Sequence, residues 1–299
     1  MDGRILVVMN ARSGRLSLRQ KMTELRDALS RHGLGPEIRI VRRGGQIAEA
    51  VADGVRAGFD TIVVGGGDGT LCAAVAHLAD TGRRLGVLPL GTFNYFARSL
   101  GIPPTIAGAV AVLAQGHEQC VSIGEVNGKV FLNNASLGIY ARVLEQRERL
   151  YGSWGRSRLA AHLSVLLGLA RARAPLLLRV TVDGATRRRR TPMVFVANNS
   201  FQLAEFGLAG AECLEQGRLA LYVAPDCGRL ALLALASRLV LGRLRAARDF
   251  ELFCGAEIVV ETNRPRRHVV RDGERERLPG PYRFRRRRDA LRVLTPLPG

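Results

Sequence analysis

Short apolar runs alternate with amphipathic stretches over the first 100 or so residues. Strands are predicted at residues 5–9, 37–41, 61–64 and 84–90, and the runs at 5–9 and 61–64 have the composition of buried strands in a parallel sheet. Apolar residues recur with helical spacing in the segments between them: residues 18–32, 47–57, 71–78 and a helix beginning at 94. This alternation predicts a doubly wound α/β domain, which binds ligands beyond the carboxyl ends of its strands.

The pattern changes near residue 120, where strand-like runs follow one another around tight turns. Asn127-Gly128 and Asp183-Gly184 are strong signals for two-residue hairpin turns. A hairpin is expected at 121–132 and strands at 176–182, 193–197, 218–223, 257–261, 268–271 and 290–294, with helical insertions at about 155–174 and about 229–247. We therefore expect an α/β domain over 1–120 and a mainly β domain, a sandwich, over 121–299. The last strand is allowed to return to the first domain.

Composition narrows the class of protein. The chain has 299 residues and 47% hydrophobic content, which is ample for the cores of about two domains. No signal peptide is expected, and no run reaches the length of about 18 uncharged apolar residues that a membrane helix needs. The cysteines are scattered without a CxxC pair, which argues against a zinc site and a disulfide framework. We expect a reducing, cytoplasmic compartment.

The net charge of +19 favours a polyanionic partner. Nucleic acid, an anionic membrane and a phosphorylated ligand all fit this charge, and so does an arginine-rich solvated surface with no partner. Aromatic residues make up only 5% of the chain, and no recognition-helix signature is present. We therefore expect no specific nucleic-acid partner.

The segment TIVVGGGDGTL at 61–71 carries the clearest candidate chemistry. Glycines after a strand let backbone N–H groups approach a ligand closely, and with the next helix N-terminus they form an anion site. The segment is neither a Walker A loop nor a Rossmann fingerprint. A carboxylate at Asp68 would repel phosphates unless a cation lay between them, which suggests a nucleotide with Mg²⁺. The alternative is a glycine-rich turn with a solvated aspartate.

Four landmarks in the chain resemble one known family. GGDGT at 66–70 is similar to the nucleotide loop of the diacylglycerol kinase catalytic superfamily, which includes bacterial lipid kinases, sphingosine kinases and, more distantly, NAD kinases and phosphofructokinases. NARSG at 10–14 resembles its NPxSG loop, with Ala11 in place of proline. PLGTFNYFARSLG at 89–101 resembles PLGTxNDFAxxLG, and DGE at 272–274 resembles a C-terminal DGE segment. The landmarks occur in family order and extend over nearly the whole chain.

The resemblance implies a fold and an activity. The fold would be a nucleotide-binding α/β domain of the NAD-kinase and phosphofructokinase type followed by a β-sandwich lipid domain. ATP would bind in the cleft between them with Mg²⁺, and its γ-phosphate would pass to a lipid hydroxyl, with diacylglycerol the first expectation. A sphingoid base, a monoacylglycerol or a glycolipid as acceptor remains open, as does a catalytically weak nucleotide or lipid sensor. Partners would be the membrane lipid substrate and the anionic inner membrane surface, bound peripherally. A homodimer is left open.

Site residues follow from the matched positions. The nucleotide-binding set is Asn10, Ser13, Gly14, Gly65, Gly66, Gly67, Asp68, Gly69, Thr70, Leu71, Thr92 and Asn94. Glu274 would be the general base and Asp68 would hold the Mg²⁺ network, with Asp272 as a second metal candidate. Each has an alternative: Thr92 as a helix N-cap, Asp272 as a turn residue and Glu274 as a solvated side chain.

Some positions depart from the family pattern. Tyr95 stands where relatives often carry an aspartate. The resemblance implies an accessory Mg²⁺ site at Glu215 and Gln216, where the amide of Gln216 replaces a carboxylate, which is the better Mg²⁺ ligand. The segment 156–174 has an apolar face with arginines at both ends, which fits an interfacial helix or ordinary packing against the sandwich.

Overall fold

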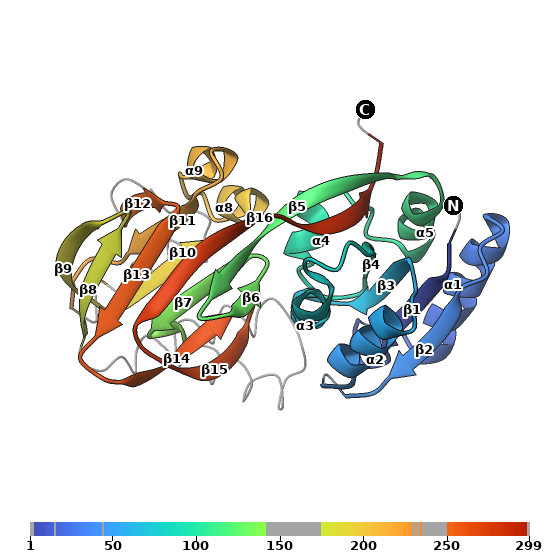
Figure 1. The fold of residues 1–299 in the computed structure, drawn as a ribbon, viewed down its shortest axis with the longest axis horizontal. Coiled ribbons are helices and arrows are strands. Elements are labelled where there is room, and N and C mark those ends of the chain that lie inside the picture. The colour runs from blue at the N-terminus through green and yellow to red at the C-terminus, as the bar shows by residue number, and fades with distance from the viewer. Residues whose placement is uncertain are drawn as a thin grey trace. The chain divides into compact units, whose positions relative to one another are not determined.

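The computed structural model describes residues 3–14, 16–43, 45–141, 175–228, 231, 234 and 250–297. They form two compact units, one of Met1–Ile123 with Arg287–Gly299 and one of Gly124–Arg286 (Figure 1). The division lies close to the expected boundary at residue 120. The helical insertions expected at about 155–174 and about 229–247 lie outside the described residues, apart from residues 231 and 234.

The first unit is built on a parallel sheet in the order β2-β1-β3-β4. Its strands are β1 (Ile5–Asn10), β2 (Glu37–Val41), β3 (Thr61–Gly66) and β4 (Arg84–Pro89), and its helices are α1 (Leu18–Arg31), α2 (Gly45–Arg56), α3 (Asp68–Leu78), α4 (Tyr95–Ser99) and α5 (Ile106–Gln115). The middle residues of β1 and β3 are completely buried. This explains their unbroken apolar runs, because both faces of the sheet are covered. The doubly wound α/β prediction is confirmed.

The chain reverses direction across this sheet between β1 and β3. The connection from β1 goes to β2 on one side, and the connection from β2 goes to β3 on the other side. Right-handed crossovers therefore place α1 and α2 on opposite faces. In keeping with this, α1 packs with α5, whereas α2 packs with α3. The carboxyl ends of β1 and β3 flank the reversal, which is where open α/β sheets bind ligands.

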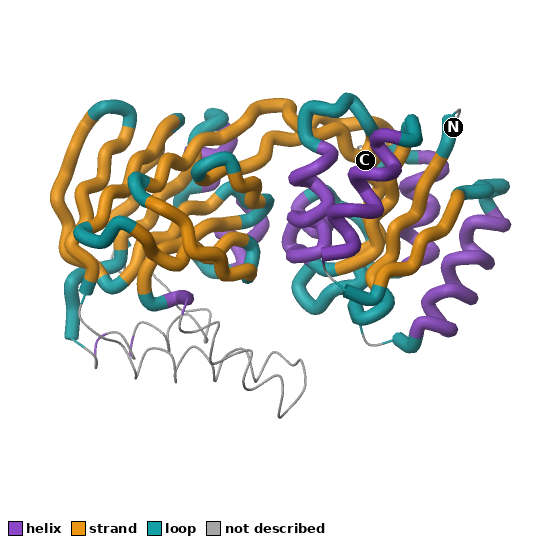
Figure 2. Tube along the Cα trace, turned by 60° about the horizontal axis from the view of Figure 1, so that its bottom comes forward, coloured by secondary structure: helices purple, strands orange, loops and turns teal. Residues whose placement is uncertain are grey.

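The second unit is a pair of mainly antiparallel sheets. Figure 2 shows how much of this unit is strand. One sheet has the strand order β12-β11-β10-β7-β14-β15. The other sheet contains the consecutive strands β16-β13-β8-β9. Bounds of these and the neighbouring elements are β5 (His117–Val126), β6 (Lys129–Phe131), β7 (Asn134–Gly138), β8 (Leu176–Val182), β9 (Ala185–Thr191), β10 (Met193–Ala197), α8 (Ser200–Glu205), α9 (Ala211–Glu215), β11 (Leu219–Val223), β12 (Glu251–Gly255), β13 (Glu257–Thr262), β14 (Arg266–Arg271), β15 (Glu274–Pro279) and β16 (Tyr282–Thr295).

One hydrophobic core joins the two sheets of this unit. Leu137 and Val196 come from the six-stranded sheet, and Val260 and Phe284 come from the other. The predicted sandwich is thus confirmed. The end of β16 pairs with β4 of the first unit, Arg292 opposite Arg84.

Three hairpins in the second unit turn on an Asn-Gly or Asp-Gly pair. Both turn residues have positive φ in each: Asn127 48° and Gly128 78°, Asp183 44° and Gly184 87°, Asp272 47° and Gly273 89°. These values are typical of the two-residue turn whose twist matches the flanking strands. The two hairpin turns predicted from sequence are confirmed, and Asp272-Gly273 forms a third.

Cys213 and Cys254 form a disulfide, so the expectation of no disulfide is wrong for this pair. The residues are 41 positions apart and their Cα atoms lie 5.4 Å apart. Cys213 lies in α9, which packs on β11, and Cys254 lies in β12, where it pairs with Ala220 of β11. Tertiary packing therefore brings together two cysteines that no local spacing connects. Cysteine usage no longer supports a reducing compartment.

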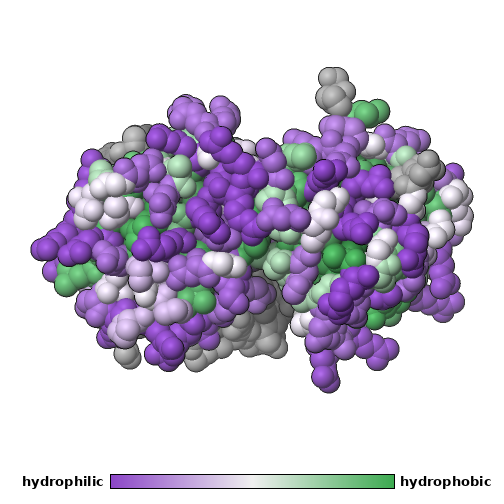
Figure 3. All heavy atoms as spheres, in the orientation of Figure 1, coloured by the Kyte–Doolittle hydropathy of each residue, from purple (hydrophilic) through white to green (hydrophobic). Residues whose placement is uncertain are grey.

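The surface of the described residues is predominantly polar. Their exposed large hydrophobic side chains are Leu16, Ile40, Leu177 and Leu297. Hydrophilic residues dominate the face drawn in Figure 3, with hydrophobic ones scattered among them. Within the described residues, no helix has the length and apolar character needed to cross a membrane.

Candidate functional site

Three loops of the first unit follow the carboxyl ends of β1, β3 and β4, and they contact one another. A Cβ placed on Gly14 would lie 2.6 Å from the carbonyl oxygen of Leu90. The Asn10 side-chain amide donates to the Thr70 hydroxyl at 3.4 Å. The structure therefore brings the predicted residues of all three loops to one end of the sheet.

The first loop, residues 10–14, is a tight turn organised by Asn10. Its Oδ1 accepts the Arg12 N–H at 3.0 Å, and its carbonyl accepts the Ser13 N–H at 3.2 Å. Gly14 has a φ of 81°, a left-handed conformation that glycine adopts without strain. Ser13 is 7% exposed. These contacts fix the backbone of the loop and leave little freedom to its N–H groups.

Close packing within the protein requires the glycines of the second loop, independently of any role in ligand binding. Gly65 and Gly66 still belong to β3, and a Cβ on Gly66 would lie 2.4 Å from the Thr70 Cβ. Gly67 is the N-cap of α3, and a Cβ on the facing Gly91 would lie 2.5 Å from the Gly67 Cα. Two glycines are thus needed where the second and third loops touch backbone to backbone.

Helix α3 begins at Asp68, directly after the glycines. The Leu71 N–H makes the first helical hydrogen bond, to the Gly67 carbonyl at 3.0 Å. The N–H groups of Asp68, Gly69 and Thr70 precede it in the first turn and have no helical carbonyl to bind, which is the arrangement by which helix N-termini can bind anions. Leu71 differs from the expectation, because its side chain is 0% exposed and its N–H is used within the helix. Its role here is packing.

Asp68 connects α3 to the third loop. Its Oδ1 accepts the Phe96 N–H at 3.1 Å, so the carboxylate also holds the start of α4. Tyr95, at the position where relatives often carry an aspartate, stacks on Phe93 with ring centroids 5.5 Å apart. The described residues contain no group of three or more His, Cys, Asp or Glu side chains that would hold a metal alone. Mg²⁺ bound mainly through phosphates and water needs only one or two protein carboxylates, so Asp68 fits that mode.

Asn94 and Thr92 have different places in the third loop. Asn94 is buried, with a φ of 51°. Its Oδ1 accepts the Gly91 N–H at 2.9 Å, and its Nδ2 donates to the Pro89 and Gly91 carbonyls at 3.1 and 3.0 Å. The side chain is therefore committed to shaping the loop. Thr92 is exposed, and α4 has Asn94 rather than Thr92 at its N-cap.

Asp272 and Glu274 lie at the turn between β14 and β15 in the second unit. Asp272 Oδ2 accepts the Leu132 N–H at 2.6 Å, and Oδ1 accepts the Asn133 and Asn134 N–H groups at 2.8 and 3.1 Å. These bonds give Asp272 a structural role, and its expected Mg²⁺ role stays a prediction. Glu274 opens β15 opposite Arg271 and is exposed. Its carboxylate is thus presented on a turn that Asp272 holds in place.

The predicted accessory metal site has a cationic side chain beside it. Glu215 ends α9 and Gln216 is its C-cap. The Leu214 carbonyl in the same turn accepts a hydrogen bond from Arg286. A guanidinium therefore already binds the carbonyl end of this short helix.

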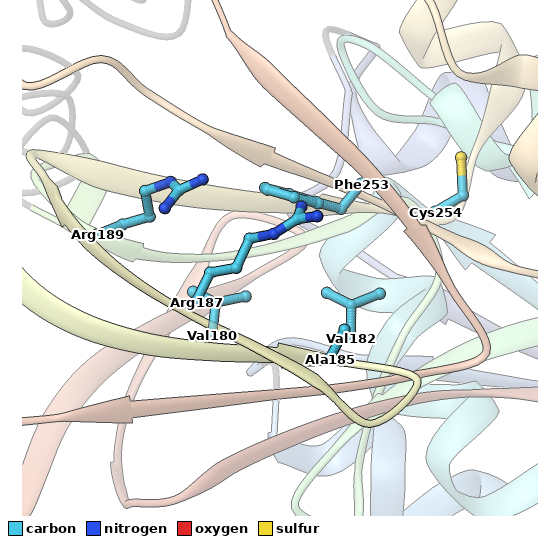
Figure 4. A pocket seen from close by; sticks show the side chains of 7 residues that line it. All are labelled: Val180, Val182, Ala185, Arg187, Arg189, Phe253 and Cys254. Atoms are coloured by element: carbon cyan, nitrogen blue, oxygen red, sulfur yellow. The ribbon is translucent and has the colours of Figure 1, made fainter.

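A separate pocket of about 190 Å³ lies on β8, β9 and β12 (Figure 4). Its lining is Val180, Val182, Ala185, Arg187, Arg189, Phe253 and Cys254. Arg187 lies over the Phe253 ring, 5.0 Å from its centroid, and Arg189 pairs with Glu251. None of the predicted site residues lines it.

The sequence patterns missed Lys21, which lies beneath the first loop. Lys21 is 1% exposed and donates to the Ala11 and Ser13 carbonyls at 2.9 and 2.7 Å. Burial lowers the pKa of its ammonium group. A signal was present in the sequence, because Lys21 stands on the apolar face of its helix, three residues after Leu18 and four before Leu25.

Family models match both units. The diacylglycerol kinase catalytic domain matches residues 4–126, and the YegS C-terminal NAD kinase beta sandwich-like domain matches residues 133–295. The chain belongs to the diacylglycerol kinase catalytic-domain superfamily. The landmarks at 10–14, 66–70 and 89–101 lie within the first match, and the DGE segment lies within the second.

Curated relatives of this superfamily match part of the chain. A probable YegS-like lipid kinase of Pseudomonas aeruginosa is 39% identical over 145 residues, 48% of this chain and 46% of the relative. A diacylglycerol kinase of Staphylococcus aureus is 31% identical over 145 residues, again 48% and 46% of the two chains. The matched segment therefore spans about half the length of these relatives.

Solved structures share the whole fold. A putative diacylglycerol kinase from Bacillus anthracis superposes with a TM-score of 0.79 at 20% identity, covering 99% of both chains. A second putative diacylglycerol kinase from the same organism gives 0.77 at 22% identity, over 99% of this chain and 98% of the other. At this level of identity the likeness establishes the fold alone.

Proposed function

We propose that this chain is an ATP- and Mg²⁺-dependent lipid kinase that transfers the γ-phosphate of ATP to the free hydroxyl of diacylglycerol, giving phosphatidic acid. The observation that carries the proposal is the convergence of three loops and the α3 N-terminus at the reversal of the sheet, in a chain of the diacylglycerol kinase superfamily. The names of the relatives support a lipid acceptor.

The first unit would bind the nucleotide through its phosphates. The Gly14 N–H and the first-turn N–H groups of α3 are the donors, and the glycines allow the close approach that such donors need. Bound Mg²⁺ would neutralise charge on the phosphates, and Asp68 is the residue that would hold it. Asn94 and Lys21 would act indirectly, by shaping the third and first loops.

The second unit would activate the acceptor. Phosphoryl transfer requires that the acceptor hydroxyl lose a proton as its oxygen bonds to the γ-phosphorus and the bond to the β-phosphate oxygen breaks. Glu274 is exposed at the start of β15 and would accept that proton. Asp272 would keep Glu274 in position through its three backbone hydrogen bonds.

The enzyme would meet its lipid at an anionic membrane surface. A net charge of +19 supports this association, because each basic residue near an anionic bilayer contributes about 1 kcal/mol. Part of the arginine-rich stretch at 264–288 is neutralised internally. Arg271, Arg283 and Arg285 pair with Glu276, Glu257 and Glu125. The net charge of +19 already counts these glutamates, so the pairs lower the number of unpaired arginines in the stretch and leave the net charge unchanged.

A lipid panel in mixed micelles tests the proposal. Purified protein, Mg²⁺ and γ-labelled ATP are incubated with diacylglycerol, monoacylglycerol, a sphingoid base or a glycolipid, beside Asp68→Asn and Glu274→Gln. Asp27→Asn, which removes an exposed charge from α1, is the control. Label in phosphatidic acid that both site variants abolish, and the control keeps, is the expected result. Label in another lipid changes the acceptor, and ATP binding without transfer to any lipid favours the sensor.

A further inference from the structure

Lys21 is a buried cation whose described partners carry no negative charge. Its side chain is 1% exposed, and its ammonium donates to two backbone carbonyls, those of Ala11 and Ser13. An ammonium group loses its hydration on burial, and two neutral acceptors replace it only in part. Burial lowers the pKa of the group, as expected for a charge without an acidic neighbour. The adjacent apolar positions of α1 show that a hydrophobic residue would suit the packing there.

The two carbonyls determine where the loop points its amides. A trans peptide is planar, so each carbonyl and the N–H that follows it point in opposite directions. With the Ala11 and Ser13 carbonyls directed at Lys21, the Arg12 and Gly14 N–H groups are directed away from it. The Arg12 N–H donates to Asn10 Oδ1 at 3.0 Å. The Gly14 N–H donates to no group among the described residues.

Gly14 is held from its other side as well. Its φ of 81° and the 2.6 Å from a Cβ at this position to the Leu90 carbonyl oxygen leave room for glycine alone. The Gly14 amide is therefore fixed in direction by Lys21 below and by the third loop beside it, and no described residue accepts its hydrogen bond. Such an amide, near a positive charge that no described acidic residue pairs with, suits a phosphate oxygen.

We propose that Lys21 is a positioning residue for the polyphosphate of ATP: it turns the Gly14 N–H toward the phosphates, and its buried charge is balanced when they bind. The inference rests on the proposed nucleotide function and deepens it. It assigns the first loop's affinity for phosphate to a helix residue beneath the loop, outside the family landmarks.

The proposal predicts that loss of the Lys21 charge affects phosphate-bearing ligands selectively. Removing the ammonium should lower the affinity for a ligand more, the more phosphates the ligand carries, and should leave the binding of the nucleoside part unchanged. If Lys21 only stabilised the loop, its substitution would instead lower the melting temperature and lower the affinities for ATP and adenosine by similar factors.

The test compares Lys21→Met and Lys21→Gln with Arg19→Met. Arg19 lies on the same helix and is exposed, so its substitution removes one positive charge outside the loop contacts. Binding of ATP, ADP, adenosine and inorganic tripolyphosphate is measured by calorimetry or competition, with melting temperature as the check of folding. Gln keeps a donor for one carbonyl and removes the charge, so it provides a folded variant should the methionine protein fail to fold.

We expect Lys21→Met to lower the affinity for ATP and for tripolyphosphate at least tenfold, the affinity for ADP by less, and the affinity for adenosine less than twofold. Lys21→Gln should have affinities between those of wild type and Lys21→Met. Arg19→Met should stay within twofold of wild type for every ligand. Equal affinities of the folded Lys21 variants and wild type for ATP would overturn the inference, as would equal losses for ATP and adenosine. Absence of ATP binding to the wild-type protein would instead overturn the proposed function.

Discussion

The Asp272→Ala variant tests whether Asp272 of the DGE segment has a structural role. The carboxylate accepts three backbone N–H groups, from Leu132, Asn133 and Asn134, at 2.6, 2.8 and 3.1 Å. A hydrogen bond to a charged group contributes about 1.5–3 kcal/mol, and three bonds that share one carboxylate are not additive. Alanine at the φ of 47° adds about 1–2 kcal/mol of backbone strain. We expect a loss of about 3–4 kcal/mol in the free energy of unfolding.

Asp272→Asn isolates the hydrogen bonds from the strain, because asparagine tolerates the same backbone conformation. Its amide oxygen still serves Asn133 and Asn134, whereas its NH₂ group faces the Leu132 N–H. A smaller loss of about 1–2 kcal/mol is expected. Urea unfolding followed by circular dichroism measures both values. Hydrogen exchange of the amides at 132–134 reports the same bonds locally.

Glu274→Ala is the control for the two Asp272 variants. Glu274 is exposed two residues away, so its removal should change stability by less than about 0.5 kcal/mol while abolishing phosphoryl transfer. If Asp272→Ala unfolds within 0.5 kcal/mol of wild type and its amides exchange no faster, the structural role given to Asp272 is wrong.

Three further outcomes are expected. Gly91→Ala should disrupt the contact with Gly67 and lower stability and nucleotide binding together, whereas Gly35→Ala, where a Cβ meets nothing within 4 Å, should be neutral in both measurements. Alkylation under denaturing conditions should label three thiols before reduction and five after it, because Cys213 and Cys254 are bonded; five labelled thiols without reductant would contradict the disulfide. The hydrogen bond from Arg189 lowers the pKa of Glu251 below its usual 4.5, so their pairing stabilises the protein above that pH and is lost as the pH falls through the lowered value. Glu251→Gln should therefore flatten acid unfolding below about pH 4.5, and an unchanged profile would count against the pairing.

The inner strands of the first unit, β1 and β3, were predictable because they are buried on both faces and carry apolar runs. The hairpins at Asn127 and Asp183 were predictable for a different reason: their positive φ values restrict the turn residues. The arginine-rich strand β9 was not predicted. It is an edge strand, so its mostly exposed side chains show no apolar alternation and its sequence resembles a solvated charge run.

The location of the candidate site followed from residue types at strand ends, but the direction of each polar group did not. Asn94 was expected near the nucleotide, which stays a prediction, and its side chain binds three backbone groups of its own loop. Lys21 was missed because an isolated lysine in a helical pattern is usually solvated, and only the tertiary structure shows its contacts with loop carbonyls. Hydrogen bonds between segments far apart in sequence decide such roles, and no local pattern encodes them.

The most direct test of the central claim is transfer of label from γ-labelled ATP to diacylglycerol by the wild-type protein and by Asp68→Asn, with Mg²⁺ and without it. The account predicts labelled phosphatidic acid from the wild type with Mg²⁺, none without it, and a rate at least about 100-fold lower for Asp68→Asn. An Asp68→Asn protein that folds and transfers phosphate at the wild-type rate would contradict the account, because its chemistry would then not depend on the carboxylate at the start of α3.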